Sequence, residues 1–205
     1  MRSPLLHGEL VRLRPIEPRD ADRLWASVQD PDGGRLTGMG TSGSSTRAEV
    51  DAWAATAATV PGRYDWAVTA AAVRDGELVS DDLIGEIALD QVDTGRASAN
   101  LRLRMLRDYR GRGYGREAIS QVLRFAFTPA DHPDGPDGSP GAGLGLHRVS
   151  LSVMSMNTRA RALYDSLGFR EEGRLRDAYR DGDGWADAVV MSILEDEFRA
   201  GEGAD

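Results

Sequence analysis

The segment Arg110–Gly115 has the residue types and the spacing to bind a phosphorylated ligand. Its glycines stand at every second position, Gly111, Gly113 and Gly115, with arginines between and beside them. Glycine lets a backbone turn tightly and approach a ligand closely. A strand pattern ends before this segment and a helix pattern begins after it, so the unpaired N–H groups of a helix N-terminus would face the phosphate. The segment therefore predicts a protein that binds a phosphorylated cofactor.

Two common nucleotide-binding patterns do not fit the chain. A dinucleotide fingerprint has glycine at its first, third and sixth positions, and Arg116 stands at the sixth position after Gly111. The later segment Gly141–Gly145 fails in the same way, because Leu146 stands in that place. An ATP-binding P-loop needs a lysine, and the chain has none. A nicotinamide site and a nucleotide phosphotransferase are therefore both disfavoured.

The composition limits the chemistry and the partners. The chain has 205 residues, 25 basic residues that are all arginine, 33 acidic residues and no cysteine, for a formal net charge of −8. Without cysteine there is no disulfide, thiolate metal site or cysteine nucleophile. An acidic chain disfavours nucleic acid as a partner and favours a cationic substrate such as an amine. No membrane-spanning apolar run and no signal peptide are present, so we expect a cytoplasmic protein without a membrane partner.

The hydrophobic pattern predicts one domain of mixed α and β structure over residues 1–205. Strands are predicted at residues 9–14, 64–73, 83–89, 101–105 and 149–153, followed by a hairpin whose last strand is 185–194. Helices are predicted at residues 20–28, from 45 or 46 to 58 with Glu49 in a capping box, around 119–126, and 157–168. Glycine, serine and proline predict loops at 38–45 and, as a flexible insertion, at 129–145.

Two spaced motifs and two flanking blocks resemble a known family. Arg110–Gly115 has the Arg/Gln-x-x-Gly-x-Gly/Ala form of an acetyl-CoA signature, and Asn157–Phe169 is an Asn-capped helix that carries a tyrosine and closes in Leu-Gly-Phe. Both resemble the GCN5-related N-acetyltransferase (GNAT) superfamily. The blocks Gly8–Pro15 and Glu171–Arg176 resemble its branch of ribosomal-protein-alanine N-acetyltransferases. The resemblance implies a mostly antiparallel seven-stranded sheet with a splayed strand pair, flanked by about four helices.

The resemblance also implies acetyl-CoA as co-substrate. Backbone N–H groups of Arg112–Gly115 would hold its pyrophosphate, with charge-assisted contacts from the neighbouring arginines. The strand segment Leu103–Leu106 would pair with the pantetheine arm, and the N–H near Met105 would polarise the thioester carbonyl. Asn157 is an N-cap by its own chemistry and would also contact the arm. The predicted cofactor-binding residues are Leu103, Met105, Leu106, Arg110, Gly111, Arg112, Gly113, Tyr114, Gly115, Arg116 and Asn157.

Acetyl transfer to an amine needs an acid for the leaving thiolate and a base for the ammonium group. Tyr164 lies on the apolar stripe of its helix, which by itself indicates a core residue, whereas the resemblance implies that it protonates the CoA sulfur. Glu86 is the candidate base because it is charged within an otherwise apolar strand, and an outward-facing strand residue is the equal alternative. Asp90 is a weaker candidate base. Asn100 and Trp66 are candidate substrate-binding residues.

Several alternatives stay open at this level. The acceptor is either a ribosomal-protein N-terminus or a small-molecule amine, and transfer is expected to be direct, in a ternary complex, because no cysteine can carry the acetyl group. A non-catalytic acyl-CoA-binding sensor or scaffold is the alternative function. Trp53 and Trp66 either line the acceptor pocket or fill the core. The three histidines are too scattered to predict a metal site, and a homodimer is a family-level expectation.

Overall fold

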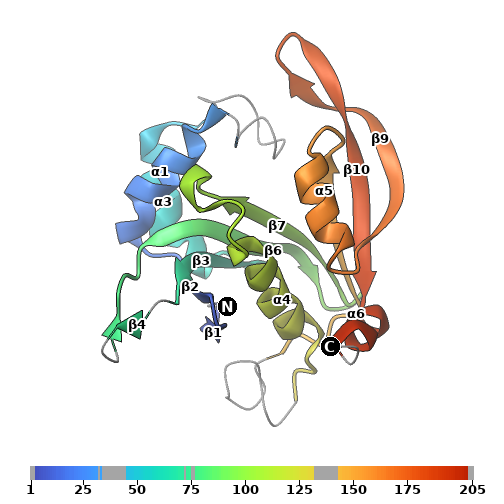
Figure 1. The fold of residues 1–205 in the computed structure, drawn as a ribbon, viewed down its shortest axis with the longest axis horizontal. Helices are drawn as coiled ribbons and strands as arrows, with labels where there is room; N and C mark the ends of the chain where they lie inside the picture. The colour runs from blue at the N-terminus through green and yellow to red at the C-terminus, as the bar shows by residue number, and fades with distance from the viewer. Residues whose placement is uncertain are drawn as a thin grey trace.

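The computed structural model describes residues 3–31, 33, 45–71, 73–74, 77–131 and 143–202. Within these residues, eight strands form one sheet in the order β1-β2-β3-β6-β7-β8-β10-β9, and β4 and β5 form a separate pair (Figure 1). Neighbouring strands of the large sheet are antiparallel except β7 and β8, which run parallel. The β7–β8 pair is therefore the place where antiparallel pairing changes to parallel pairing.

The elements have the following bounds. The strands of the large sheet are β1 (Leu6–His7), β2 (Val11–Pro15), β3 (Tyr64–Ala70), β6 (Leu83–Asp93), β7 (Ser98–Met105), β8 (Arg148–Met154), β9 (Arg170–Asp181) and β10 (Gly184–Leu194). The small pair consists of β4 (Val73–Arg74) and β5 (Glu77–Leu78). The helices are α1 (Ala21–Val28), α3 (Arg47–Thr56), α4 (Tyr114–Phe127), α5 (Thr158–Asp165) and α6 (Glu195–Glu202), with 3-10 turns η1 (Pro18–Asp20), η2 (Ala57–Thr59) and η3 (Arg107–Tyr109).

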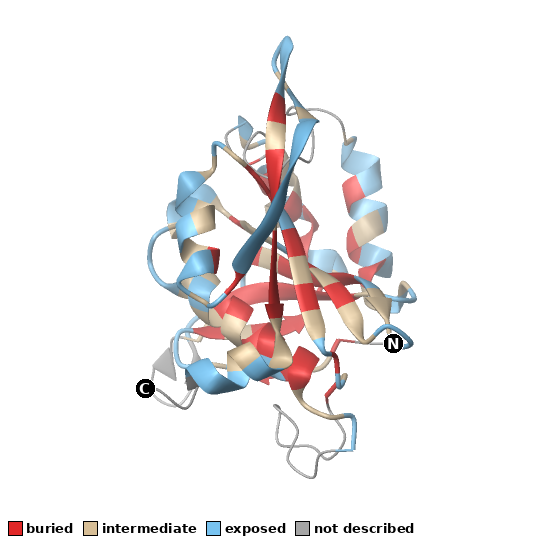
Figure 2. Ribbon diagram, turned by 90° about the vertical axis from the view of Figure 1, so that its right-hand side faces the viewer, coloured by how far each residue is buried: buried red, intermediate tan, exposed pale blue. Residues whose placement is uncertain are grey.

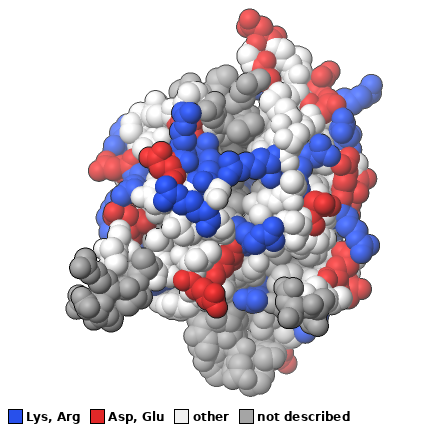
Figure 3. All heavy atoms as spheres, in the orientation of Figure 1, with Lys and Arg blue, Asp and Glu red and all other residues white. Residues whose placement is uncertain are grey.

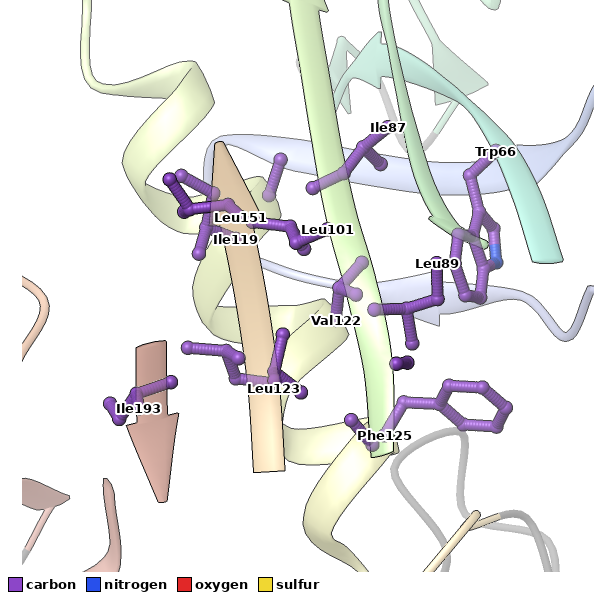
Figure 4. Packing of buried hydrophobic residues seen from close by; sticks show 14 of the residues in the cluster. Trp66, Ile87, Leu89, Leu101, Ile119, Val122, Leu123, Phe125, Leu151 and Ile193 are labelled. Atoms are coloured by element: carbon purple, nitrogen blue, oxygen red, sulfur yellow. The ribbon is translucent and has the colours of Figure 1, made fainter. Parts of the chain in front are cut away.

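Two hydrophobic cores lie on opposite faces of the sheet. Helix α4 presents Ile119, Val122, Leu123 and Phe125 to the larger core, because these residues recur at helical spacing on one face (Figure 4). The side chains of α1 and α3 form the smaller core with Ala67 of β3 and its neighbours. Because side chains alternate along a strand, one face of β3 contributes to each core.

The predicted fold class is confirmed, with two differences in number. The sheet has eight strands rather than seven, because β1 is two residues long and is too short to show an alternating pattern. The described residues form five α-helices rather than about four. The additional helix, α6, is almost entirely polar and packs through Phe198 against Phe127, with ring centroids 5.5 Å apart.

Several boundaries follow from local chemistry. Helix α3 begins after Thr46 with the predicted capping box, in which Glu49 and Thr46 bond reciprocally. The strand predicted to extend to residue 73 ends at Ala70. Most of the loop predicted at 38–45, and residues 132–142 of the insertion predicted at 129–145, lie outside the described residues. Among the described helices, none is long and apolar enough to cross a bilayer.

An ion pair and a group of hydrogen bonds fix the N-terminal part of the chain. The buried Arg14 guanidinium forms a bidentate pair with Asp20, with both N···O distances 2.7 Å. The Glu117 carboxylate of α4 accepts the backbone N–H groups of residues 9, 10 and 11 at 2.7–2.8 Å. Gly8 lies against this carboxylate so closely that an added Cβ would stand 2.6 Å from its Cδ. Helix α4 is thereby joined to the β1–β2 turn.

Strand β9 forms one edge of the large sheet and is largely exposed. It pairs with β10 on one side, with two register irregularities, and nearly all of its residues face solvent (Figure 2). Strand β10 lies between β8 and β9, as its apolar sequence predicts. The tip carries Trp185, with Arg180 4.9 Å from the ring centroid.

Candidate active site

The split between β7 and β8 opens a large cavity. The two strands pair only from Ser98 to Asn100 on β7, and beyond that point they diverge. A cavity of about 800 Å³ occupies the opening and extends toward α1 and α3. This volume lies within the range of small-molecule sites. The cavity brings together residues that are far apart in the sequence, from Leu24 to Tyr164.

The glycine loop forms one wall of the cavity and ends at the N-terminus of α4. Gly111 and Gly113 have φ values of 80° and 87°, which favour glycine. A Cβ at Gly111 would stand 2.3 Å from Nη2 of Arg159, which lies over the loop. Gly113 is the N-cap, and no side chain caps the helix there. The first N–H groups of α4 are therefore available to an anion, which the helix dipole also favours.

Basic side chains surround this wall (Figure 3). They belong to the η3 segment, the glycine loop and the first turns of α4 and α5: Arg107, Arg110, Arg112, Arg116 and Arg159. The Arg112 guanidinium lies 5.9 Å from the Tyr109 ring centroid. Arg116 reaches α5, where its Nη2 donates to Ser166 Oγ at 2.5 Å. The local charge is thus positive although the whole chain is acidic.

Arg110 holds the protein together rather than facing outward with the other arginines. Its Nε donates to Met105 O at 3.0 Å, and its Nη2 forms an ion pair with Asp30, just after α1. The sequence predicts a phosphate contact for this residue, and the structure instead directs two of its donor groups at protein acceptors. Arg110 therefore fixes the end of β7 beside the glycine loop.

The open edge of β7 presents backbone groups to the cavity. The N–H of Leu106 donates to Ile84 O at 2.9 Å, toward β6. Because N–H groups alternate in direction along a strand, those of Leu103 and Met105 point away from β6, into the split. Gly85 permits this arrangement, since a Cβ there would stand 2.5 Å from Met105 Sδ. An extended ligand can thus pair with this edge as a strand would.

Three predicted cofactor residues, Leu106, Arg112 and Tyr114, lie outside the cavity lining. Leu106 packs against the smaller core, beside α1 and α3. Tyr114 opens α4 and packs against the larger core, with its ring centroid 6.4 Å from that of Tyr109. Of Leu106 and Tyr114, only Tyr114 keeps a backbone contact open, since its N–H lies in the first turn of α4.

Tyr164 lies on α5 and lines the cavity, although it is a buried residue. Its ring packs edge-on against Phe169, with centroids 5.7 Å apart. Burial raises the pKa of its phenol to about 12 because the charged phenolate is poorly solvated there. The phenol is therefore protonated throughout the physiological pH range. Asn157, the N-cap of the same helix, accepts from Ala160 N at 3.1 Å and also lines the cavity.

Glu86 lines the cavity from the middle of β6 and is paired with Arg104 of β7. The two residues are opposite each other in the ladder, and both Nε and Nη2 of Arg104 donate to Glu86 Oε1. Asp90 lies four residues along β6, where it pairs with Arg102 at 3.1 Å. Glu86 is thus the candidate base that faces the cavity, whereas Asp90 is outside the described lining.

The two predicted substrate-binding residues occupy other places. Trp66 is fully buried in the larger core, where its Nε1 donates to Pro4 O at 2.8 Å. Asn100 donates its Nδ2 to Asp90 Oδ1 at 2.9 Å, outside the cavity lining. The Trp66 prediction is corrected here, because register turns this side chain to the core face. The Asn100 amide has a carboxylate partner within the sheet, and its substrate role stays a prediction. Trp53 of α3 lines the cavity instead.

The structure also brings in residues that sequence reasoning missed. Arg63 and Asp65 form a bidentate pair at 2.6 and 2.7 Å, and both line the cavity. Burial raises the pKa of the Asp65 carboxyl, although the Arg63 guanidinium opposes this shift. Arg63 stands just before the apolar strand β3 and Asp65 lies within it. Charged residues at such positions were the signal in the sequence that could have pointed to this part of the cavity. Among the described residues, no cluster of three histidine or acidic side chains suits a metal ion.

Comparisons with known proteins agree with this geometry. The family model of the acetyltransferase (GNAT) domain matches residues 11–170. A putative ribosomal N-acetyltransferase of Bacillus subtilis is 26% identical over 93% of this chain and 94% of its own. The spermidine N(1)-acetyltransferase of Vibrio cholerae is 27% identical over 57% of this chain. The chain spans about three-fifths of the length of that relative and of two further N-acetyltransferases from Bacillus species.

A solved structure supports the fold. The spermidine N-acetyltransferase of Vibrio cholerae in complex with CoA and spermine superposes with a TM-score of 0.75, at 20% identity over 94% of this chain and 99% of that one. A match at this identity speaks for the fold alone. The family model covers most of the chain, and the splayed sheet and glycine loop agree with it. This chain belongs to the GNAT acetyltransferase family.

Proposed function

We propose that this chain transfers an acetyl group from acetyl-CoA to a primary amine, directly and in a ternary complex. One observation carries the proposal: the split between β7 and β8 joins an uncapped helix N-terminus, an open strand edge and Tyr164 in one cavity. The residues fit the co-substrate. The first turn of α4 suits a pyrophosphate, and the edge of β7 suits an amide-bearing arm.

The chain's own groups then have distinct roles. When bound, acetyl-CoA supplies the activated acyl group as a thioester. The N–H of Met105 would donate to the thioester carbonyl, and Arg110 would hold that residue in place through its carbonyl oxygen. The Tyr164 phenol holds the proton that a leaving thiolate needs. Glu86 would accept a proton from the amine, directly or through water, at Oε2, since Arg104 occupies Oε1.

The relatives suggest two classes of acceptor. One is named a putative ribosomal N-acetyltransferase and another a spermidine N(1)-acetyltransferase, and both names imply an amine acceptor. A ribosomal-protein N-terminus and a small-molecule amine are accordingly the two candidates. A cytoplasmic location, a single domain and a homodimer remain predictions from the sequence.

Calorimetric titration with acetyl-CoA tests the proposal, with ATP and NADH as controls. We expect saturable binding of acetyl-CoA alone, followed by amine-dependent release of free thiol. Absence of binding would overturn the proposed function. Binding without thiol release across peptide and small-amine acceptors would favour a non-catalytic acyl-CoA sensor.

A further inference from the structure

The acceptor half of the cavity has a charge pattern that differs from that of the whole chain. Away from the glycine loop and the first turns of α4 and α5, the described lining residues include three arginines and three acidic residues, although the formal net charge of the chain is −8. The acidic three are Glu49, Asp65 and Glu86. Each of them is engaged: Glu49 in its capping box with Thr46, and the other two with arginines. A polycation entering here would meet no surplus of negative charge on these residues.

Three ion pairs lie on one face of β3, β6 and β7 and along the loop before β3. Glu86 pairs with Arg104 across the ladder, and Ala88 in the same ladder faces both Asp65 and Arg102. Opposite residues point to the same face of a sheet, so these side chains share the face that α3 covers. The three pairs are Arg63–Asp65, Glu86–Arg104 and Asp90–Arg102.

The exposed partner differs from pair to pair. The side chain of Arg63 is 21% exposed and that of Asp65 is 4% exposed. Arg102 is 44% exposed, against 11% for Asp90. The order is reversed in the third pair, where Glu86 is 20% exposed and Arg104 is 10%. Of these three pairs, the cavity therefore presents one carboxylate, Glu86, and two guanidinium groups beyond it. Glu49, in the first turn of α3, is a further lining carboxylate.

The positions of these groups along the strands set a distance. Glu86 is opposite Arg104, next to Met105 and the end of β7 where acyl transfer would occur. Arg102 is two residues farther from that end, or about 7 Å along the strand. An amine that gives its proton to Glu86 would thus place the next part of the acceptor over Arg102, and a longer acceptor would reach Arg63.

Arg63 is prepared to bind an anion. Its pair with Asp65 uses Nε and Nη2, and a guanidinium has five N–H donors, so the Nη1 group can serve a further acceptor. Its Cζ also stands 4.6 Å from the Trp53 ring centroid, so the indole packs against the guanidinium. An arginine held in this way loses little freedom when it binds a carboxylate.

We propose that the acceptor carries an acidic group about 7 Å from its reacting amine, and that Arg102 and Arg63 bind this group. The inference rests on the proposed function. A polyamine would set a second positive charge against two guanidinium groups, which disfavours it. An acid of this kind has two sources: a small amino acid with a separated amine, or a peptide N-terminus with an acidic side chain at its second residue.

Matched acceptors test the inference in the wild-type protein. Thiol release is measured with 5-aminopentanoate against 5-aminopentanamide, with an Ala-Glu-initiated peptide against its Ala-Gln counterpart, and with spermidine. We expect kcat/KM to be at least about tenfold higher for the acid in one of the two pairs, and to exceed that of spermidine. The pair that responds identifies the source. Equal rates for acid and amide in both pairs, or a preference for spermidine, would overturn the inference and leave the transferase intact.

A variant pair ties the effect to Arg102. In Arg102→Gln the preference for the acid should fall at least about fivefold, with no change in acetyl-CoA affinity by calorimetry. Arg96→Gln is the control, because Arg96 lies in the β6–β7 turn with its side chain 86% exposed, outside the cavity. A preference retained in a folded Arg102→Gln protein would contradict the assignment. If no amine releases thiol from an acetyl-CoA-binding protein, the proposed function itself fails, and this inference fails with it.

Discussion

At the scale of the residue, burial determines what Tyr164 can contribute. A phenol in water begins to lose its proton near pH 10. In the cavity wall, poor solvation of the phenolate raises the pKa of Tyr164 to about 12. The group is consequently a proton donor at every pH at which the amine acceptor begins to lose its own proton.

Replacing Tyr164 with phenylalanine should separate binding from turnover. Tyr164→Phe keeps the ring and its packing against Phe169 but removes the proton donor. General acid catalysis commonly contributes a factor of 10² or more, so we expect kcat to fall at least about a hundredfold. The acetyl-CoA dissociation constant from calorimetry should change less than about twofold. An unchanged kcat would show that Tyr164 is only a packing residue.

The pH dependence offers an independent check on the same residue. The acceptor amine must be neutral to attack, so kcat/KM should rise with pH. Since the folded pKa of Tyr164 is raised, its acid form persists as the pH increases, and no descending limb should appear below about pH 10. Rates from a stopped assay between pH 6 and about pH 10 would reveal any descending limb. A fall in rate centred near pH 9 in a stable protein would speak against the buried phenol as the acid.

At the scale of the element, one arginine connects three segments. Arg110 links the carbonyl of Met105 at the end of β7 to Asp30 after α1, and its own backbone begins the glycine loop. The same guanidinium thus fixes the edge of β7 that would pair with the cofactor and the end of helix α1 on the acceptor side. Movement of the α1 end is expected to disturb the strand edge.

Asp30→Asn tests this connection by removing the charge while it keeps the shape. A hydrogen bond to a charged group typically contributes about 1.5–3 kcal/mol, and partial exposure of this pair reduces that amount. We expect the acetyl-CoA dissociation constant to rise about fivefold in calorimetry. Glu195→Gln makes the same chemical change in a more exposed arginine pair, with Arg199 in α6, and should leave the constant unchanged. Equal effects of the two variants would contradict a link through Arg110.

The sequence predicts well those features that depend on neighbouring residues, such as caps and tight loops. It predicts poorly those that depend on which strands pair. The glycine loop before α4 and the Thr46 cap of α3 depend on neighbouring residues, and both are read from short patterns. Trp66 is different, because β3 is buried on both faces and hydrophobicity alone does not show which face bears the cavity. Only the register with β6 places Asp65 on the cavity face and Trp66 on the other.

At the scale of the whole molecule, Glu117 joins the cofactor helix to the start of the chain. Its carboxylate accepts three backbone N–H groups from residues 9–11 of the β1–β2 turn. Hydrogen bonds to a charged acceptor are stronger than those between neutral groups, and the bond from Val11 is also partly buried. The N-terminal strands and the helix that starts at the glycine loop are therefore expected to unfold together.

Glu117→Gln replaces this acceptor with an amide and should lower global stability. The loss of charged hydrogen bonds is expected to cost about 2 kcal/mol, which for a chain of this length lowers the melting temperature by about 4–8 °C. Differential scanning calorimetry measures the change. Glu9→Gln removes an equal charge from the β1–β2 turn but leaves the Glu117 acceptor in place, and should shift the melting temperature by less than about 1 °C. Similar shifts for both would indicate a general charge effect.

The exposed edge strand β9 has a consequence for how copies of the chain meet. An open strand edge is a template for pairing with a second molecule, and at 12 residues this one is long. A two-fold antiparallel pairing centred on Leu175 would oppose Arg174 to Arg176, and Arg170 to Arg180. Centres on the other residues from Glu172 to Ala178 each oppose at least one pair of arginines as well. Like charges directly opposite each other are destabilising, so the order of the arginines along this edge protects the molecule from aggregation by strand addition.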